Sequence, residues 1–142
     1  LTTSMTSAPS PNSLLVWTHM GGKVTEVGRT ETAFWHRDAR FLWEVKAIWP
    51  QTDQTVQNVN WAYQLGEGMA PHSIGAYCNY IDPLLHDWPE LFYGDNYAEL
   101  CRIKEAVDPD HHFRFQQAIG SPFNPDGAYP PNLAPLYRTF LV

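Results

Sequence analysis

The segment ARFLWEVKAIW, residues 39–49, constrains the fold most, because its apolar and polar side chains alternate as they do in a β-strand. One side of this strand is expected to carry Phe41, Trp43, Val45 and Ala47. The other side carries Glu44 and Lys46, because residues two apart on a strand point to the same face. We therefore expect one apolar face that packs, and an opposite face that meets water or lines a site.

After Pro50 the periodicity changes to that of a helix. The stretch TDQTVQNVNWAYQL, residues 52–65, predicts a helix with Thr52 or Asp53 as its N-cap and Gly66 as its terminator. One side of this helix is expected to carry Val56, Val59 or Asn60, and Tyr63. A helix that directly follows a strand favours a mixed domain.

Two further strand patterns flank these elements. SLLVWTHM, from Ser13, leads into Gly21-Gly22 and then KVTEVGRT, which predicts a β-hairpin. IGAYCNYI, residues 74–81, is expected to be a strand on which Tyr77 and Asn79 share one face. A phenol and an amide would then project together from the sheet.

A second helix, YAELCRIKEAV, is expected to follow the capping-box pattern Asn96-x-x-Glu99 and to stop at Asp108-Pro109. Before it, DPLLHDWPELFYGDN is expected to be a loop with at most a helical turn, and after it HHFRFQQAI a short extended piece. From Ser121 onward the chain is rich in proline, which predicts a surface strap or tail. Three or four strands with two helices make an α+β unit.

The composition fits one domain and excludes some classes of partner. The chain has 142 residues, 44% of them hydrophobic, which suffices for a core. A formal net charge of -6 offers no basic surface for nucleic acid. No apolar run approaches the roughly 20 residues that span a membrane. Cys78 and Cys101 are expected to be free thiols rather than a disulfide.

Three segments together resemble the C-terminal part of berberine bridge enzyme-like, FAD-linked oxidases. They are GGKVTEVGRTETAFWHRDARFLWEVKAIW, AYCNYIDP and YGDNYAELCRIKEAVDPDHHFRF, whose order and spacing match the family from Ser13 to Ile119. The resemblance implies an α+β fold, with helices on one face of an antiparallel sheet, as part of the substrate domain of a VAO/PCMH-type flavoprotein. The chain would divide into a leader or linker at 1–12, the end of the substrate domain at 13–75, a berberine-bridge-like segment packing toward the FAD domain at 76–119, and a Pro-rich tail at 120–142.

The resemblance also implies the activity and its partners. FAD would be held mainly by a segment absent from this chain, so that a separate FAD-domain polypeptide of a split or cleaved enzyme is the expected partner. The reaction would be dehydrogenation of an alcohol, a carbohydrate or a specialised metabolite, with O2 as the electron acceptor. A redox-neutral cyclase, or a non-catalytic binding or assembly module that kept the fold, is the alternative. The protein is expected to be secreted or extracellular, with the cytoplasm as the alternative.

Within the resemblance, Tyr77 matches the tyrosine of the family's Y-x-N motif and would be the catalytic base. A phenol has a solution pKa of about 10, so a nearby cation or donated hydrogen bonds must favour the phenolate. Apart from the resemblance, the sequence predicts only that Tyr77 is a half-buried tyrosine on a strand, with its hydroxyl in a hydrogen bond. Asn79, Tyr80 and Asn96 would contact the cofactor, although Asn96 alternatively caps its own helix.

Glu44 would be an auxiliary base or substrate ligand, and its alternative is a surface ion pair with Lys46, which contributes little. The residues expected to contact substrate are Trp17, His19, Met20 and Lys46. Met20 stands where several relatives have a tyrosine, which weakens any mechanism that needs two tyrosines. No metal site is expected, because the pairs His36-Arg37 and His111-His112 lack a third ligand at suitable spacing.

Overall fold

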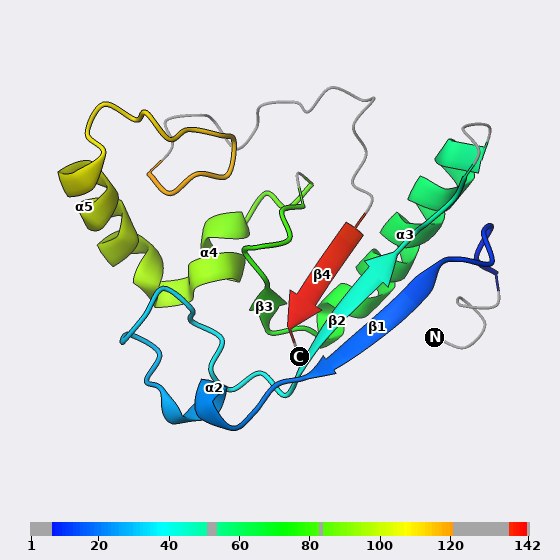
Figure 1. The fold of residues 1–142 in the computed structure, drawn as a ribbon, viewed down its shortest axis with the longest axis horizontal. Helices are drawn as coiled ribbons and strands as arrows, with labels where there is room; N and C mark the ends of the chain where they lie inside the picture. The colour runs from blue at the N-terminus through cyan, green and yellow to red at the C-terminus, as the bar shows by residue number, and fades with distance from the viewer. Residues whose placement is uncertain (1–6, 51–53, 83, 121–136, 142) are drawn as a thin grey trace.

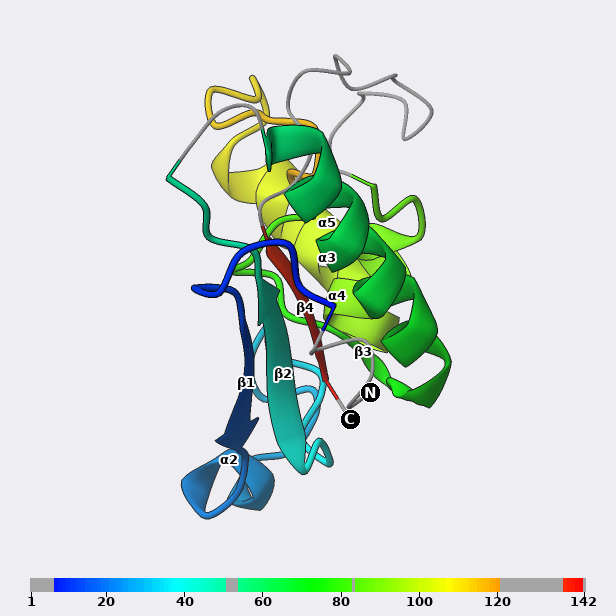
Figure 2. The same ribbon diagram turned by 90° about the vertical axis from the view of Figure 1, so that its right-hand side faces the viewer.

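The computed structural model describes residues 7–50, 54–82, 84–120 and 137–141. Its 4-stranded antiparallel sheet has the order β1-β2-β4-β3 (Figure 1). The strands are β1 (Leu14–His19), β2 (Phe41–Lys46), β3 (Gly75–Ala76) and β4 (Tyr137–Leu141). Helices α3, α4 and α5 lie to one side of these strands (Figure 2), which confirms the predicted α+β fold.

The central strand β2 confirms the strand predicted for residues 39–49. Trp43 and Val45 are fully buried and belong to the main core, which also contains Trp61 and Leu65 of α3 (Thr55–Met69). Leu42 points to the opposite face, where it packs with Ala39 in a second, smaller cluster. The alternation along β2 therefore separates a helix-covered face from a face that is free to line a site.

Helix α3 confirms the predicted helix, and the side that carries Val56 and Tyr63 is largely exposed. Val56 is 68% exposed and Tyr63 is 40% exposed. The buried residues of α3 are Asn58, Trp61, Ala62, Leu65, Gly66 and Met69. The large Trp61 and Leu65, four residues apart, lie on the side of α3 that packs on β2. The polar Asn58 is buried on the same side, and it interrupts the apolar periodicity that would have indicated this side from the sequence.

The ends of α3 also differ from the prediction. Gly66 does not terminate the helix, which continues to Met69 and into a short 3-10 turn at Ala70–His72. Gly66 is instead buried, where a residue without a side chain suits close packing. The predicted N-caps, Thr52 and Asp53, lie outside the described residues; the helix is preceded by Gln54, whose side chain makes no capping hydrogen bond.

The predicted hairpin at Gly21-Gly22 is wrong. Residues Lys23–Glu26 form the short helix α2 rather than a strand, and β1 pairs with β2, with Trp17 opposite Trp43. Gly22 has a φ of 58°, a left-handed conformation that redirects the chain without the cross-strand turn of a hairpin. The long apolar alternation of β2 offers β1 a better partner than KVTEVGRT does.

The strand predicted for residues 74–81 is wrong beyond Ala76. Strand β3 has only 2 residues, and the chain then turns, with the Tyr80 amide donating to the Tyr77 carbonyl at 3.0 Å. β3 passes very close to a histidine, since a Cβ built on Gly75 would lie 2.0 Å from the imidazole of His36. Only glycine therefore fits at position 75.

The second predicted helix is confirmed as α5 (Tyr97–Val107), which ends at Asp108. The predicted loop before it contains α4 (Trp88–Tyr93) and a 3-10 turn at Gly94–Asn96, so regular structure there was underestimated. The capping box is wrong, because the side chain of Asn96 makes no capping hydrogen bond. The extended piece predicted for residues 111–119 is also wrong, since this segment is made of turns and irregular chain.

The last strand corrects the predicted tail. Tyr137–Leu141 form β4, which pairs with both β2 and β3 inside the sheet, while the proline-rich residues 121–136 lie outside the described part. Because the partners of β4 are remote in the sequence, no local sequence pattern predicts this pairing. In the described part of the chain, no helix is both long and apolar enough to span a membrane.

Candidate functional site

A pocket of about 480 Å³ lies on the face of β2 that α3 does not cover. Leu42 of β2 and Thr18 of β1 contribute to it from neighbouring positions, since they are cross-strand partners. Its lining consists of Thr18, Met20, Val24, Ala33, Phe34, Arg37, Leu42, Tyr77, Cys78 and Asn79. The volume is that of a small-molecule site, and most of its walls are apolar.

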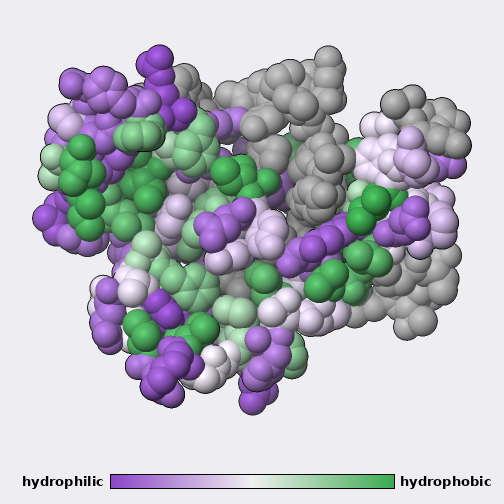
Figure 3. All heavy atoms as spheres, in the orientation of Figure 1, coloured by the Kyte–Doolittle hydropathy of each residue, from purple (hydrophilic) through white to green (hydrophobic). Residues whose placement is uncertain are grey.

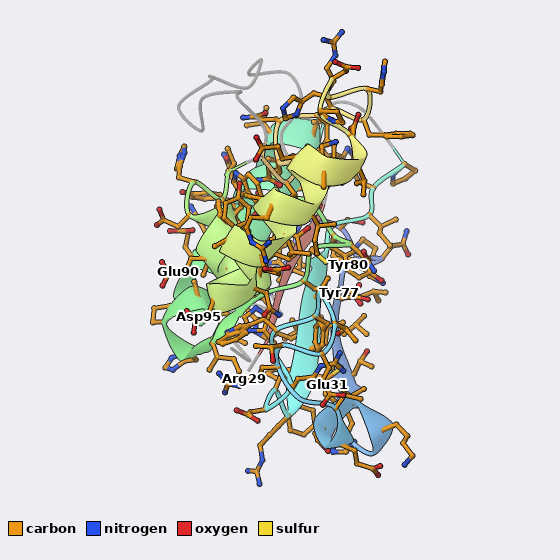
Figure 4. All side chains as sticks on the ribbon, turned by 90° about the vertical axis from the view of Figure 1, so that its left-hand side faces the viewer. Arg29, Glu31, Tyr77, Tyr80, Glu90 and Asp95 are labelled. Carbon is orange, nitrogen blue, oxygen red and sulfur yellow. The ribbon has the colours of Figure 1, made fainter. Side chains whose placement is uncertain are left out.

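The turn after β3 brings the phenol and the amide of the Y-x-N motif together at this pocket. The side-chain amide of Asn79 donates through Nδ2 to the hydroxyl oxygen of Tyr77 at 2.8 Å. The prediction that these two groups lie together is therefore right about their proximity, but a turn rather than a strand face achieves it. Figure 4 shows Tyr77 and Tyr80 side by side, and their ring centroids are 5.6 Å apart.

Aromatic contacts fix the ring of Tyr77. Its centroid lies 6.1 Å from that of Phe34 in an edge-to-face arrangement. The hydrogen bond from Asn79 directs the proton of the Tyr77 hydroxyl away from the amide. Its two neighbours, Asn79 and Phe34, therefore orient the phenol at the edge of the pocket.

Glu44 and Lys46 lie on the same face of β2 as Leu42 but do not line the pocket. Glu44 is 5% exposed, and the distance from Lys46 Nζ to its Oε2 is 2.8 Å. The predicted ion pair is thus present, although its carboxylate is buried rather than on the surface. Whether Glu44 or Lys46 acts on a substrate stays a prediction.

The predicted substrate residues on β1 and just after it lie on different faces of the sheet. Met20 lines the pocket with Tyr77 and Asn79. Trp17 and His19 are exposed and instead contact Phe41, with ring centroids 6.0 Å and 5.4 Å away. Because Trp17 and Trp43 are cross-strand partners, Trp17 lies on the face opposite the pocket.

The side chain of Asn96 bonds to the loop at residues 29–32 rather than to Tyr77. Its buried side-chain amide donates to the carbonyl of Arg29 at 2.6 Å and to that of Thr32 at 3.1 Å. It therefore tethers the 29–32 loop to the start of α5. A cofactor role for Asn96 stays a prediction and has no support from these contacts.

Sequence reasoning missed Phe34 and Arg37 as pocket residues. Arg37 Nε donates to the Phe34 carbonyl at 3.0 Å, and its guanidinium carbon lies 5.0 Å from the Phe34 ring centroid. In the sequence His36-Arg37 suggests at most a metal-binding pair, and the contacts that bring this segment to Tyr77 are long-range. No local pattern marks residues that meet only through the fold.

Cys78, in the turn at residues 77–80, makes a side-chain hydrogen bond with Tyr93 of α4. Burial raises the pKa of the Cys78 thiol, and burial together with the nearby Cys78 raises the pKa of Tyr93 to about 12. Both groups therefore stay neutral near pH 7 and are poor bases. Both cysteines are free, as predicted, and each is half-buried.

His36 holds the 29–38 loop against α4. It is 5% exposed, and its Nε2 lies 2.6 Å from the carbonyl oxygen of Leu91. Burial lowers the pKa of His36, an effect that the hydrogen bond to Leu91 opposes and the positive charge of Arg29 reinforces. The neutral imidazole is therefore the form that the fold accommodates.

We expect this burial to make the protein less stable in mild acid. The folded-state pKa of His36 lies below its unfolded value of 6.5, so its stabilising contribution is complete above pH 6.5 and is lost as the pH falls below it. For one group the loss is at most about 1.4 kcal/mol per pH unit. Urea unfolding at pH 7.5 and 5.5 measures it.

The matched variants are His36→Gln, which should flatten this pH dependence, and His86→Gln at an exposed position, which should leave it unchanged. An equal pH dependence in wild type and His36→Gln would show that another group is responsible.

The family model described as "Berberine and berberine like" matches residues 76–120. The uncharacterized FAD-linked oxidoreductase YgaK of Bacillus subtilis is 34% identical over 112 residues, which cover 79% of this chain and 25% of the relative. Berberine bridge enzyme-like 25 of Arabidopsis thaliana is 29% identical over 127 residues, 75% of this chain and 23% of that protein.

The fold has a solved counterpart. The crystal structure of a glycopeptide hexose oxidase in complex with teicoplanin is similar with a TM-score of 0.76 and 25% identity, over 83% of this chain and 28% of the oxidase. The chain spans about a quarter of the length of the curated relatives it matches. It is similar to the C-terminal part of berberine bridge enzyme-like, FAD-linked oxidoreductases, which confirms the resemblance predicted from its sequence.

Proposed function

We propose that these residues form the substrate side of an FAD-dependent oxidase in which Tyr77 takes a proton from the substrate. The observation that carries the proposal is the hydrogen bond from Asn79 Nδ2 to Tyr77 Oη, 2.8 Å long, at the edge of a pocket of about 480 Å³. A base is required because oxidation of an alcohol removes a proton from oxygen as hydride leaves carbon. The Asn79 amide and the Phe34 ring hold the Tyr77 hydroxyl at the pocket, where it can meet the hydroxyl of a substrate.

The residues beside Tyr77 fit a flat, partly polar ring. Tyr80 is 38% exposed and Ile81 is 44% exposed, so the turn presents aromatic and apolar surface next to the Asn79 amide. We propose that Asn79 and Tyr80 meet the flavin ring there. When bound, FAD would supply an acceptor for the hydride and pass the electrons on to O2.

Glu44 has a secondary place in the proposal. Its buried carboxylate is held by Lys46 outside the pocket lining, at an Oε2 to Nζ distance of 2.8 Å. The two charges of the pair would offset each other and keep the sheet face next to the pocket close to neutral. The proton itself would pass to Tyr77.

The rest of the site is proposed to lie in FAD-binding residues outside this chain. The comparisons give no support for a separate FAD-domain polypeptide, and we propose instead that the FAD-holding segment belongs to the same kind of longer chain as in the relatives. The substrate would be a small alcohol, carbohydrate or specialised metabolite. We also propose that the protein is secreted.

The test is flavin reduction in the full-length polypeptide that carries these residues. We expect visible flavin bands, bleaching of these bands by substrate without oxygen, and their return when O2 is admitted. The Tyr77→Phe variant should keep the bands and lose the bleaching. A folded, full-length protein that stays colourless after incubation with FAD would contradict the proposal.

A further inference from the structure

Arg37, which lines the pocket, differs from the other cationic side chains that the structure describes. Five of those others pair with a carboxylate: Lys23 with Glu26, Arg29 with Asp38, Lys46 with Glu44, Arg102 with Glu99, and Lys104 with Asp108. Arg40 and Arg114 have no such partner but are exposed to water. Among the cationic side chains that the structure describes, Arg37 alone is partly shielded from water and lacks a carboxylate.

The hydrogen bonds of Arg37 orient it without neutralising it. Nε donates to the Phe34 carbonyl at 3.0 Å, Nη1 donates to the Val24 carbonyl at 3.2 Å, and Nη2 donates to the hydroxyl of Thr32. A guanidinium carries five N–H donors, so one on each terminal nitrogen has no acceptor among the described residues. The acceptors are all uncharged, and no carboxylate in the described part of the chain pairs with this positive charge.

The surroundings of Arg37 make this charge effective. The lining of the pocket contains no aspartate or glutamate, and its walls include Met20, Phe34 and Leu42. An unpaired charge next to apolar surface is unfavourable, and an anion that enters the same space is attracted more strongly than it would be in water. Guanidinium is also the side chain best suited to carboxylate oxygens.

We infer that this pocket selects a ligand with an apolar, ring-sized body and one carboxylate, and that Arg37 binds the carboxylate. The inference rests on the proposed function in one respect: if this pocket receives the substrate, the substrate is an acidic alcohol whose hydroxyl lies toward Tyr77. Tyr77 and Arg37 line the same pocket, with Phe34 touching both, so one small molecule can meet both groups. Arg37 would then be a specificity-determining residue.

The experiment measures binding of trans-cinnamate and of trans-cinnamamide, its neutral counterpart of equal size, to the full-length protein by calorimetry. We expect cinnamate to bind at least about ten-fold more tightly, as a charge-assisted hydrogen bond predicts, and the preference to weaken as salt is raised. Arg37→Gln should abolish the preference. Arg40→Gln, which removes an exposed cation three residues away, should keep it.

Equal affinities for the acid and the amide in the wild type would overturn the inference, and this comparison needs no variant to fold. The same result is expected if an acidic side chain from the rest of the polypeptide occupies Arg37, so that outcome also counts against it. Binding needs no turnover. A preference for cinnamate in a folded, full-length protein that stays colourless after incubation with FAD would sink the proposed function alone, whereas oxidation of neutral alcohols with no acid preference would sink the inference alone.

Discussion

If the full-length protein is the oxidase proposed above, replacing Tyr77 by phenylalanine is expected to reduce its turnover by about 10² to 10⁴-fold, the range that a positioned general base contributes. Phenylalanine keeps the ring and its edge-to-face contact with Phe34, whose centroid lies 6.1 Å away, and removes only the oxygen that Asn79 bonds. Steady-state oxygen consumption measures the loss. Unchanged turnover would remove Tyr77 from the mechanism.

Two controls separate a chemical effect from a structural one. The Tyr77→Phe variant should unfold at the same urea concentration as the wild type to within the small shift expected for one lost hydrogen bond of about 1 kcal/mol. Asn79→Leu, which keeps the phenol and removes its donor, should also lower turnover, but by less than Tyr77→Phe. Unchanged turnover in Asn79→Leu would contradict the proposed effect of the amide on Tyr77.

Replacing Trp43 by alanine is expected to cost about 3 to 5 kcal/mol of unfolding free energy, the range for a large core aromatic. Trp43 is 0% exposed, lies on the central strand and packs in the main core, and its Nε1 donates to the hydroxyl of Ser73 at 3.3 Å. Alanine would leave a cavity between β2 and α3 that the backbone cannot close. Since folded domains are stable by only about 5 to 15 kcal/mol, much of the chain's stability would be lost.

The matched control is Trp17→Ala. Trp17 is the cross-strand partner of Trp43 but is 46% exposed, so its removal should cost much less than that of Trp43. Urea unfolding followed by circular dichroism compares the two variants. Equal losses at both positions would show that the sheet does not bury Trp43 against α3 as described.

An apolar part of the surface lies at α5 and the segment after it. Exposed apolar side chains lie on and after α5, including Ile103 at 47%, Val107 at 74% and Phe113 at 81%. In Figure 3 apolar surface gathers at the upper left, over the position that α5 has in Figure 1. Helix α5 has no buried residue, so it contributes little to the core of these 142 residues.

Periodicity predicted the elements whose signal is local. The strand around Trp43 and the helices at 55–69 and 97–107 follow from alternation and helical spacing. Pairing was harder, because Gly21-Gly22 imitates a hairpin turn, whereas β1 finds its partner about twenty residues later. Strand β4 could not be inferred, since its partners β2 and β3 are remote in sequence and proline-rich chain precedes it.

The site shows the same division. Tyr77 and Asn79 are two residues apart, so the Y-x-N motif could predict that they meet, although not that a turn joins them. Phe34 and Arg37 reach Tyr77 only because the long connection between β1 and β2 folds back over the sheet. Asn96 was misassigned for a related reason: a capping-box pattern is local, while its actual acceptors, the carbonyls of Arg29 and Thr32, are more than sixty residues earlier.

The crystal structure of the full-length protein with bound FAD tests the central claim most directly. We predict that the flavin ring lies against the turn at residues 77–80 and that the Tyr77 hydroxyl opens into the space between the ring and the pocket, still bonded by Asn79. A flavin bound elsewhere, with the Tyr77 hydroxyl enclosed by protein and out of reach of any substrate, would contradict the account.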